Sequence, residues 1–532
     1  MAGLEFALAW IAMLFAGWGT LRGCGRGALL APEAVGLALL VGSVWLALAT
    51  ALLSPFGLVT PALTLAVLAI VMAGGAAIGR RREVAVMVED ALTQPASKAA
   101  APKPRAASIA EQPNPSKSTS GSTRSPEAVD LPQAAEKEAR HQTTGAPTSP
   151  RSEPAPGGAP ATETAASTKA WLTLAPALVV VVLCFVQACG RPVFNVDAQR
   201  RWVLRAQWTA AEHTLTPAFA EDPAVAASHP SYPPLVPAAA ALALQLGGDR
   251  DHGMRPGFPV FLFALCAVVH GLAWRRAGPL AATLAPLAVA LTPALGLTDA
   301  LGLGAAAAHA DVALAAFLTA ASVLALDALR GARVPLVLLA LVALGAAWTK
   351  NEGMPFVLAM GALTFLFGCG APARKLAWRA AGMLVLTGLA GLLAWKALAH
   401  AMPVMDGEDY VSGGILAVLA ANLERLPTIL ARVGAELTAW SMWGGVWLAV
   451  PLLIGVAVWK RAGRGFWLTL AWLATGLGLV VLAYVATGWK GGNYQTLMDV
   501  SLARLLAHHA PLVVVLWVLL LDTQGTQDER SS

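Results

Sequence analysis

The chain has 532 residues, of which 57% are hydrophobic and 13% are charged, and its formal net charge is +6. Soluble globular proteins carry about 25% charged residues, so this composition excludes a water-soluble enzyme. It also excludes a coiled coil and a collagen-like fibre, and five cysteines are too few for a disulfide-stapled secreted module. The chain is therefore predicted to be a polytopic membrane protein.

Three apolar runs at the start of the chain predict the first membrane spans, at roughly 4–20, 33–53 and 57–79. A helix satisfies its own backbone hydrogen bonds in hydrocarbon and needs about 20 apolar residues to cross. The runs are continuous rather than alternating, which excludes an outer-membrane barrel. The first charge is Glu5 and no cleavage site follows, so a signal peptide is not expected. These spans form an N-terminal three-helix unit over 1–82.

The next stretch, 83–169, is rich in Pro, Ala, Ser, Thr, Lys and Glu and contains no Trp, Tyr or Cys. Such a composition cannot bury enough apolar surface to fold, and it predicts a disordered cytoplasmic linker. Its basic and acidic residues nearly balance, which argues against a polybasic lipid anchor or a nucleic-acid-binding arm. The linker leads to a larger membrane domain, 170–522, and a cytoplasmic tail, 523–532.

Further apolar runs predict the spans of the larger domain, near 171–189, 256–273, 279–297, 305–328, 335–348, 354–369, 380–399, 436–458, 466–488 and 504–521. With the first three they give an all-α polytopic membrane protein of about 13 transmembrane helices. Lys and Arg collect in the cytoplasmic loops of membrane proteins. The basic clusters all fall on one side if the linker is cytoplasmic: Arg22/Arg26, Arg80 to Arg82, Arg275/Arg276, Arg330/Arg333, Arg374/Lys375/Arg379 and Lys460/Arg461/Arg464.

One apolar run, 233–247, is short for a span, because about 15 residues cover roughly 22 Å. If it crossed the membrane, every later basic loop would face outward. It is therefore predicted to be a helix that lies in or dips into the outer leaflet. The segment 190–255 then becomes one large outward loop carrying interfacial helices.

The outward loop concentrates polar side chains on the translocated side. Two interpretations of its arginines stay open: an amphipathic interfacial helix whose side chains reach lipid phosphate, or a site for a phosphate leaving group. Asp197 lies about eight residues past the end of a span. It is either the N-cap of the helix that follows or a general base that takes the proton of an acceptor. The candidate residues of this loop are Asp197, Arg200, Arg201, Arg205, His229 and Tyr232.

Other candidates lie at the outer ends of predicted spans. Lys350 and Glu352 stand between two apolar runs, and charges near hydrocarbon usually mark a site or a pair. They either pair with each other or bind a lipid phosphate and a sugar hydroxyl. His309 and Asp311 are expected to be a polar helix cap with a sugar contact, or two ligands of a divalent cation. Arg504, at the start of the last span, contacts either phosphate or lipid headgroups.

Short motifs follow one another along the chain: Asp197 early in the outward loop, Tyr232-Pro233-Pro234-Leu235, His309-Ala310-Asp311, Trp348-Thr349-Lys350-Asn351-Glu352-Gly353, and Ser501-Leu502-Ala503-Arg504-Leu505-Leu506 before His508-His509. In this order they resemble the motifs of the GT-C superfamily of polyprenyl-phosphate-sugar glycosyltransferases. The similarity covers roughly 171–521 and is to the bacterial branch akin to protein O-mannosyltransferases and the lipid A aminoarabinose transferase. Two departures are visible: Tyr232 stands where many relatives have Lys before the Pro-Pro pair, and Asp197 is a single carboxylate where some relatives have an acidic pair.

The resemblance implies a GT-C-like helical core and an integral-membrane glycosyltransferase. Such an enzyme would move a sugar from a polyprenyl-phosphate donor to a lipid, glycan or protein acceptor at the outer face of the cytoplasmic membrane. Asp197 would be the general base. No nucleotide-sugar site, no cofactor and no nucleic-acid partner is expected, and a divalent cation is left open. The substrate-binding residues would be Arg200, Arg201, Arg205, His229, Tyr232, His309, Asp311, Lys350, Glu352 and Arg504.

Two other classes of protein remain as alternatives. A transporter or flippase for an envelope lipid or glycan precursor would concentrate polar residues near the membrane midplane and often show two similar halves. Here the polar residues gather on one side, which favours the enzyme. A non-catalytic scaffold would draw support only from the linker and the first three spans. The Ala, Arg and Gly richness indicates a bacterial inner membrane, with the site facing the periplasm.

Overall fold

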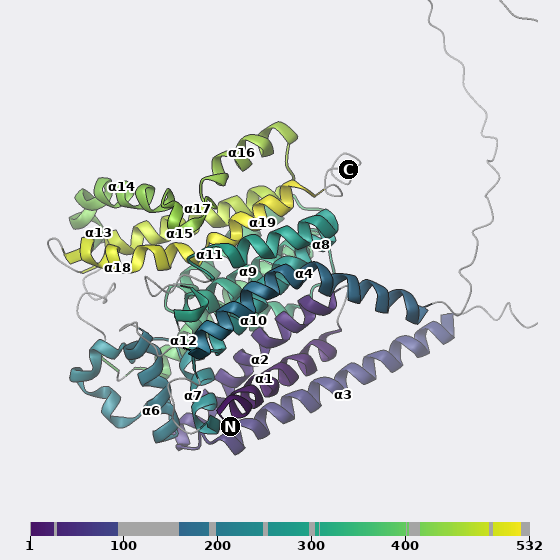
Figure 1. Cartoon of the computed structure of the whole chain (residues 1–532), viewed down its shortest axis with the longest axis horizontal. Coiled ribbons are helices and arrows are strands. Elements are labelled where there is room, and N and C mark those ends of the chain that lie inside the picture. Colours follow the sequence, from purple (N-terminus) through teal and green to yellow (C-terminus); the bar gives the residue numbers. More distant parts are fainter. Residues whose placement is uncertain are drawn as a thin grey trace, which may run out of the picture. The chain divides into compact units, whose positions relative to one another are not determined.

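The computed structural model describes residues 2–25, 29–93, 159–190, 198–247, 254–296, 304–307, 309–400, 402–403, 415–488 and 493–522. Over these residues the chain is helical and contains no strand (Figure 1), which confirms the all-α prediction. Nine helices of the described chain are long and apolar enough to cross a membrane by length and composition, and four shorter helices are apolar as well. The count of about 13 spans stays a prediction.

The helices follow the predicted order along the chain, as Figure 1 traces from purple to yellow. They are α1 (Ala2–Cys24), α2 (Ala31–Leu53), α3 (Pro61–Thr93), α4 (Ala159–Gly190), α6 (Leu204–Glu212), α7 (Leu235–Gly247), α8 (Gly257–Leu291), α9 (Ala310–Leu329), α10 (Leu336–Thr349), α11 (Gly353–Gly368), α12 (Arg374–Leu398), α13 (Ile415–Asn422), α14 (Leu426–Leu437), α15 (Trp440–Trp443), α16 (Ala449–Lys460), α17 (Arg464–Ala486), α18 (Asn493–Ala507) and α19 (Ala510–Leu520).

The N-terminal helices belong to the same compact unit as the larger domain. This unit comprises Met1–Val86 and Glu163–Ser532, and Met87–Thr162 forms a second, small unit. Within the first unit α2 packs against α8 and α10, and both α1 and α2 pack against α7. The domain division predicted from composition is therefore not a division of the packed core.

Helices reach into both margins of the predicted linker. Helix α3 continues through the arginines at 80–82 to Thr93, and α4 begins at Ala159, so 83–93 and 159–169 are helical rather than irregular. The composition of these margins misled the prediction because Ala and Glu are also good helix formers. The rest of the linker lies outside the described residues.

Helix α8 is a hairpin of two arms rather than one straight rod. The thiol of Cys266 donates a hydrogen bond to the carbonyl of Pro286 at 3.6 Å, although residues that far apart would be separated by roughly 30 Å on a straight helix. The chain reverses at Gly278, whose φ of 81° and ψ of −173° favour a residue without a Cβ. The arms correspond to the predicted spans 256–273 and 279–297.

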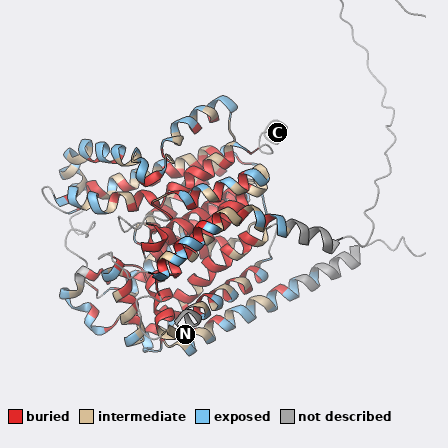
Figure 2. Cartoon of the chain, viewed as in Figure 1, coloured by how far each residue is buried: buried red, intermediate tan, exposed pale blue. Residues whose placement is uncertain are grey.

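Helix α9 is the central helix of the unit, and all of its residues are buried. In Figure 2 the central helices are mostly red, whereas the outlying helices carry long blue stretches. Helix α9 packs against α8, α10 and α12, and makes further contacts with α11, α17, α18 and α19. Its N-terminal turn carries Asp311 and its C-terminal end lies beside Arg330, so it defines two ends of the bundle, which we call the Asp311 end and the basic end.

The basic end is held together by ion pairs between distant segments. Arg275 pairs with Glu33 of α2 and, at 3.1 Å, with Asp327 of α9. Arg276 pairs with the same Asp327 at 2.6 Å. These contacts gather the ends of α2, α8 and α9. They place the basic loop after the first arm of α8 at the same end as the loop after α9, in agreement with the predicted clustering of basic loops; which face of the membrane this is stays a prediction.

Helices α10 and α11 are two short helices separated by a break at residues 350–352, close to the predicted spans 335–348 and 354–369. Helix α10 runs from the basic end toward Lys350, and α11 returns, because Gly331 before α10 and Cys369 after α11 line one cavity. The indole N–H of Trp348 donates to the carbonyl of Gly391 at 2.9 Å and ties the end of α10 to α12. A Cβ on Gly353 would lie 2.0 Å from the carbonyl oxygen of Ala346, so only glycine allows this close return.

Helix α7 matches the short apolar run 233–247 but is more buried than expected. All of its residues from Leu235 to Leu244 are buried, and the helix packs against α1, α2 and α6. The N-terminal helices and α6 cover its apolar surface. That this helix lies in or dips into the outer leaflet stays a prediction.

Candidate functional site

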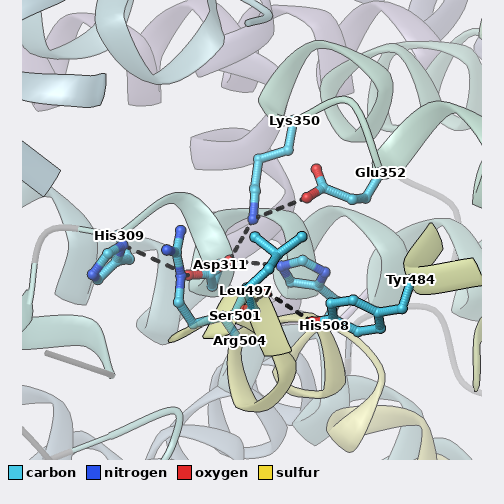
Figure 3. Close-up of polar contacts among 9 residues, drawn as sticks. All are labelled: His309, Asp311, Lys350, Glu352, Tyr484, Leu497, Ser501, Arg504 and His508. Atoms are coloured by element: carbon cyan, nitrogen blue, oxygen red, sulfur yellow. Dashed lines mark hydrogen bonds and ion pairs between the residues drawn. The ribbon is translucent and has the colours of Figure 1, made fainter. Parts of the chain in front are cut away.

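Asp311 is the centre of a buried polar cluster, shown in Figure 3. Its Oδ1 accepts a hydrogen bond from Lys350 Nζ at 2.8 Å and lies 2.7 Å from His508 Nε2. Its Oδ2 accepts a hydrogen bond from Arg504 Nε at 3.0 Å and lies 3.8 Å from His309 Nδ1. We call these five residues the Asp311 cluster.

Each member of the Asp311 cluster is placed by a break or an end in a helix. Asp311 lies in the first turn of α9, where the partial positive charge of the helix N-terminus favours a carboxylate. Lys350 follows α10 in an extended conformation, with φ −153° and ψ 159°, which turns its side chain out of the helix toward α9. Arg504 and His508 are four residues apart around the end of α18, a spacing that puts side chains on one helix face.

The charged groups of the cluster are paired with one another away from water. Asp311 and Lys350 are only 4% and 2% exposed, and Arg504 is 5% exposed. Moving single ions to such sites is costly unless they are paired and hydrogen-bonded. One carboxylate shared by an ammonium, a guanidinium and an imidazole meets that condition.

Glu352 adds a second carboxylate at the edge of the cluster. Its Oε1 lies 3.6 Å from Lys350 Nζ, and its side chain is 34% exposed. Burial by itself raises the pKa of the Glu352 carboxyl, but the Lys350 ammonium outweighs this effect and holds the pKa below its usual value. Of the two alternatives predicted for Lys350, the pair with Glu352 is present, and Lys350 lies closer still to Asp311. Binding of a lipid phosphate by Lys350 stays a prediction.

The occupied carboxylate of Asp311 decides what this cluster can do chemically. Both of its oxygens accept hydrogen bonds, so Asp311 is suited to hold cations in place rather than to take a proton from a substrate. Lys350 and Arg504 then stand as fixed, buried positive groups. Such an arrangement stabilises negative charge on a bound phosphate, because the donors need no reorganisation.

A second polar cluster joins the segment that was predicted to be the outward loop to α12. It is built by the π-helical turn η3 (Gln199–Val203), α6 and the end of α12. The guanidinium carbon of Arg201 lies 5.6 Å from the ring centre of Tyr232, and that of Arg205 lies 5.9 Å from the ring centre of Trp395. The indole N–H of Trp395 donates to the carbonyl of Ser231 at 2.7 Å and so ties α12 to the loop. We call Arg201, Arg205, Tyr232, His229 and Trp395 the loop cluster.

Arg205 is the unusual member of the loop cluster. It is 3% exposed, and within the described residues its Nη1 has no hydrogen-bond partner. Burial lowers the pKa of its guanidinium to about 9, so the group still carries its charge at neutral pH. Buried charges are almost always paired, and an arginine in this position is suited to an anionic ligand.

His229 lies beside Arg201 and Tyr232 in a conformation that is unfavourable for histidine. Its φ is +50°, it is 3% exposed, and its ring centre lies 5.0 Å from that of Tyr232. Non-glycine residues in this region cost of order 1 kcal/mol or more and concentrate at functional sites. His229 and Tyr232, both predicted substrate-binding residues, therefore lie in contact; their role stays a prediction.

Most of the predicted site residues fall into two groups, and two of them, Arg200 and Asp197, do not. One group lies at the Asp311 end and consists of His309, Asp311, Lys350, Glu352 and Arg504. The other group belongs to the loop cluster and consists of Arg201, Arg205, His229 and Tyr232. Arg200 is exposed on η3 and has no burial of the kind that Arg205 has. Asp197, the predicted general base, lies outside the described residues. Within the described chain no group of three or more His, Cys, Asp or Glu side chains is arranged to hold a metal ion.

Two residues of these clusters were not among the predicted site residues. His508 could have been found from its spacing to Arg504, because two polar residues four apart on an apolar helix share a face. Trp395 gave no such signal, since a tryptophan near the end of a span is normally read as an interfacial anchor.

Three of the motifs that carry the family resemblance meet in the Asp311 cluster: the Asp that opens α9, the Lys between α10 and α11, and the Arg of α18. A comparison of the chain with protein-family models, with curated proteins and with solved structures finds no match. Function is therefore inferred from the residues and their geometry.

Proposed function

We propose that this protein is a GT-C-like membrane glycosyltransferase. It moves a sugar from a polyprenyl-phosphate donor to a lipid, glycan or protein acceptor at the outer, periplasmic face of a bacterial inner membrane. The Asp311 end faces the periplasm and the basic end faces the cytoplasm, as the distribution of Lys and Arg favours.

The observation that carries the proposal is the convergence at Asp311. Lys350 and Arg504, separated by 39 and 193 residues from Asp311, both bind its carboxylate. Two organised cations at one end of a membrane bundle suit a donor that presents a phosphate at the membrane surface. A transporter would instead concentrate such groups near the membrane midplane.

The reaction follows from these roles. The acceptor hydroxyl oxygen attacks the anomeric carbon of the sugar, and its proton passes to the Asp197 carboxylate. The bond between that carbon and the phosphate oxygen breaks, and the electron pair leaves with the polyprenyl phosphate. Lys350 and Arg504 stabilise the charge that develops on the phosphate, and Asp311 holds both in position. Attack opposite the leaving group inverts the sugar carbon.

The loop cluster supports the same proposal independently. Within the described residues the buried guanidinium of Arg205 has no carboxylate partner, which is costly in the unliganded protein. Arg205 is suited to bind an anionic group of the donor or of the acceptor, with Trp395 presenting an aromatic face on which a sugar stacks. The cost of burial is then offset when the substrate binds.

Mass spectrometry of envelope lipids, glycans and glycoproteins tests the proposal. A strain lacking this protein is complemented with the wild type, with Lys350→Met or with Asp197→Asn. Lys460→Met serves as the matched control, because Lys460 is exposed at the end of α16 and lies outside both clusters. Protein levels are compared in all strains.

The wild type and the control are expected to restore a sugar-bearing product, and the two site variants to lose it at equal protein level. Full restoration by Lys350→Met and Asp197→Asn would contradict the glycosyltransferase. If the strain lacking the protein still makes the sugar-bearing product but keeps its precursor in the inner leaflet, the result would favour the flippase instead.

A further inference from the structure

An open cavity lies at the basic end, at the opposite end of α9 from Asp311. It has a volume of about 680 Å³ and is lined by Gly331 and by the turn from Cys369 to Leu376, which joins α11 to α12. Gly331 follows the C-terminus of α9 closely, so the cavity is far along the helix from the proposed glycosyl-transfer site. It takes no part in the reaction described above.

The walls of this cavity are positively charged. Arg374 and Lys375 line it, and no lining residue is acidic. The guanidinium of Arg464 lies against the same turn, since a Cβ on Gly370 would be 2.5 Å from its Nη1. Arg374 is oriented by Trp378, whose ring centre lies 5.0 Å from the guanidinium carbon. The cavity is therefore complementary to an anionic group.

An apolar surface continues from the cavity along α11 and α12. Phe365 and Leu366 are 46% and 62% exposed, and Leu386 and Leu393 on α12 are each 67% exposed. Trp378 stacks on Phe365, with ring centres 5.2 Å apart, at the border between this surface and the cationic cavity. Tryptophan prefers this boundary between hydrocarbon and headgroups.

We propose that the cavity binds the headgroup of an anionic glycerophospholipid whose acyl chains lie on the exposed surface of α11 and α12. A basic cavity that opens onto an apolar helix face matches both parts of such a lipid. A soluble phosphate compound would use the cavity but not the apolar surface, and this difference separates the two sources of the anionic group.

Native mass spectrometry of the full-length protein in detergent tests this site. The protein is delipidated and titrated with phosphatidylglycerol, with phosphatidylcholine or with glycerol 3-phosphate. The variant is Arg374→Gln/Lys375→Gln. The matched control, Lys460→Gln/Arg461→Gln, removes the same number of exposed charges from a neighbouring loop that does not line the cavity.

Wild type and control are expected to bind phosphatidylglycerol in preference to phosphatidylcholine. The cavity variant is expected to bind phosphatidylglycerol roughly 30-fold more weakly, because it lacks two cations and each cation near an anionic lipid surface strengthens binding by roughly fivefold. Equal binding by wild type and cavity variant would overturn the proposal. Equal loss in the control would show general charge attraction instead of a site. Displacement of the lipid by glycerol 3-phosphate at similar concentration would overturn the lipid assignment.

A second variant guards against misfolding of the first. Ala373→Glu adds a carboxylate to the cavity wall at the N-cap of α12, where negative charge favours the helix. It is expected to keep the unfolding midpoint of the wild type and to lose phosphatidylglycerol. Retained binding would contradict the proposal independently of the double variant.

Discussion

At the scale of single residues, the Asp311 cluster links stability to function. Asp311→Asn removes the charge of the carboxylate that Lys350 and Arg504 both bind in a buried site, so it is expected to lower the free energy of unfolding by about 3–5 kcal/mol. Lys350→Met should cost less, because Asp311 keeps Arg504 and His508. Thermal unfolding of the purified variants measures this order. A smaller effect for Asp311→Asn than for Lys350→Met would show that Asp311 does not organise the cluster.

Arg205 should show the opposite relation between stability and activity. Its guanidinium is buried, and within the described chain its Nη1 is unpaired, so Arg205→Met removes a desolvation cost and keeps similar bulk against Trp395. The unliganded variant is expected to unfold at the same temperature as the wild type or above it, yet to lose the sugar product in the complemented strain. A destabilised variant would indicate that Arg205 has a structural role.

At the scale of secondary-structure elements, the α10–α11 turn sets the position of Lys350. A methyl group on Gly353 would collide with the carbonyl of Ala346, so Gly353→Ala is expected to open the turn and to reduce product formation without changing a charge. Gly382→Ala in α12 is the matched control, because a Cβ there meets nothing within 4 Å. Alanine in a helix interior stabilises by roughly 0.5–1 kcal/mol over glycine, so the control should be neutral or slightly stabilised. Unfolding curves and glycan analysis of both variants check this contrast, and equal activity in the two would contradict it.

At the scale of the whole molecule, the N-terminal helices are part of the packed unit despite the linker that follows them. Chains 1–120 and 121–532 are expected to assemble when they are produced together, because α1 and α2 pack against α7 and α8, and Glu33 pairs with Arg275. Co-purification of the two chains through a tag on one of them measures the association. Glu33→Ala should weaken it by leaving Arg275 with Asp327 alone. A stable, active 121–532 chain by itself would contradict this view.

The sequence alone predicted the class of fold and most element positions, because both depend on local composition. A continuous apolar run of sufficient length becomes a helix, and α1, α2, α9 and α17 lie close to their predicted spans. Its errors have a local cause too. The margins of the linker became helical because Ala and Glu also favour helices.

Most charged members of the two clusters were candidates from the sequence, since charges beside apolar runs are rare; His508 and Trp395 were not. Only the tertiary structure decided how those residues are grouped. It brought Asp311 together with Lys350, Arg504 and His508, occupied both oxygens of Asp311, and set Arg205 against Trp395. The reason is physical: helices that are apolar on all sides, such as α9 and α10, carry no periodic signal of which face meets which neighbour. That choice is made by side-chain packing and by the pairing of buried charges, which exist only in the folded chain.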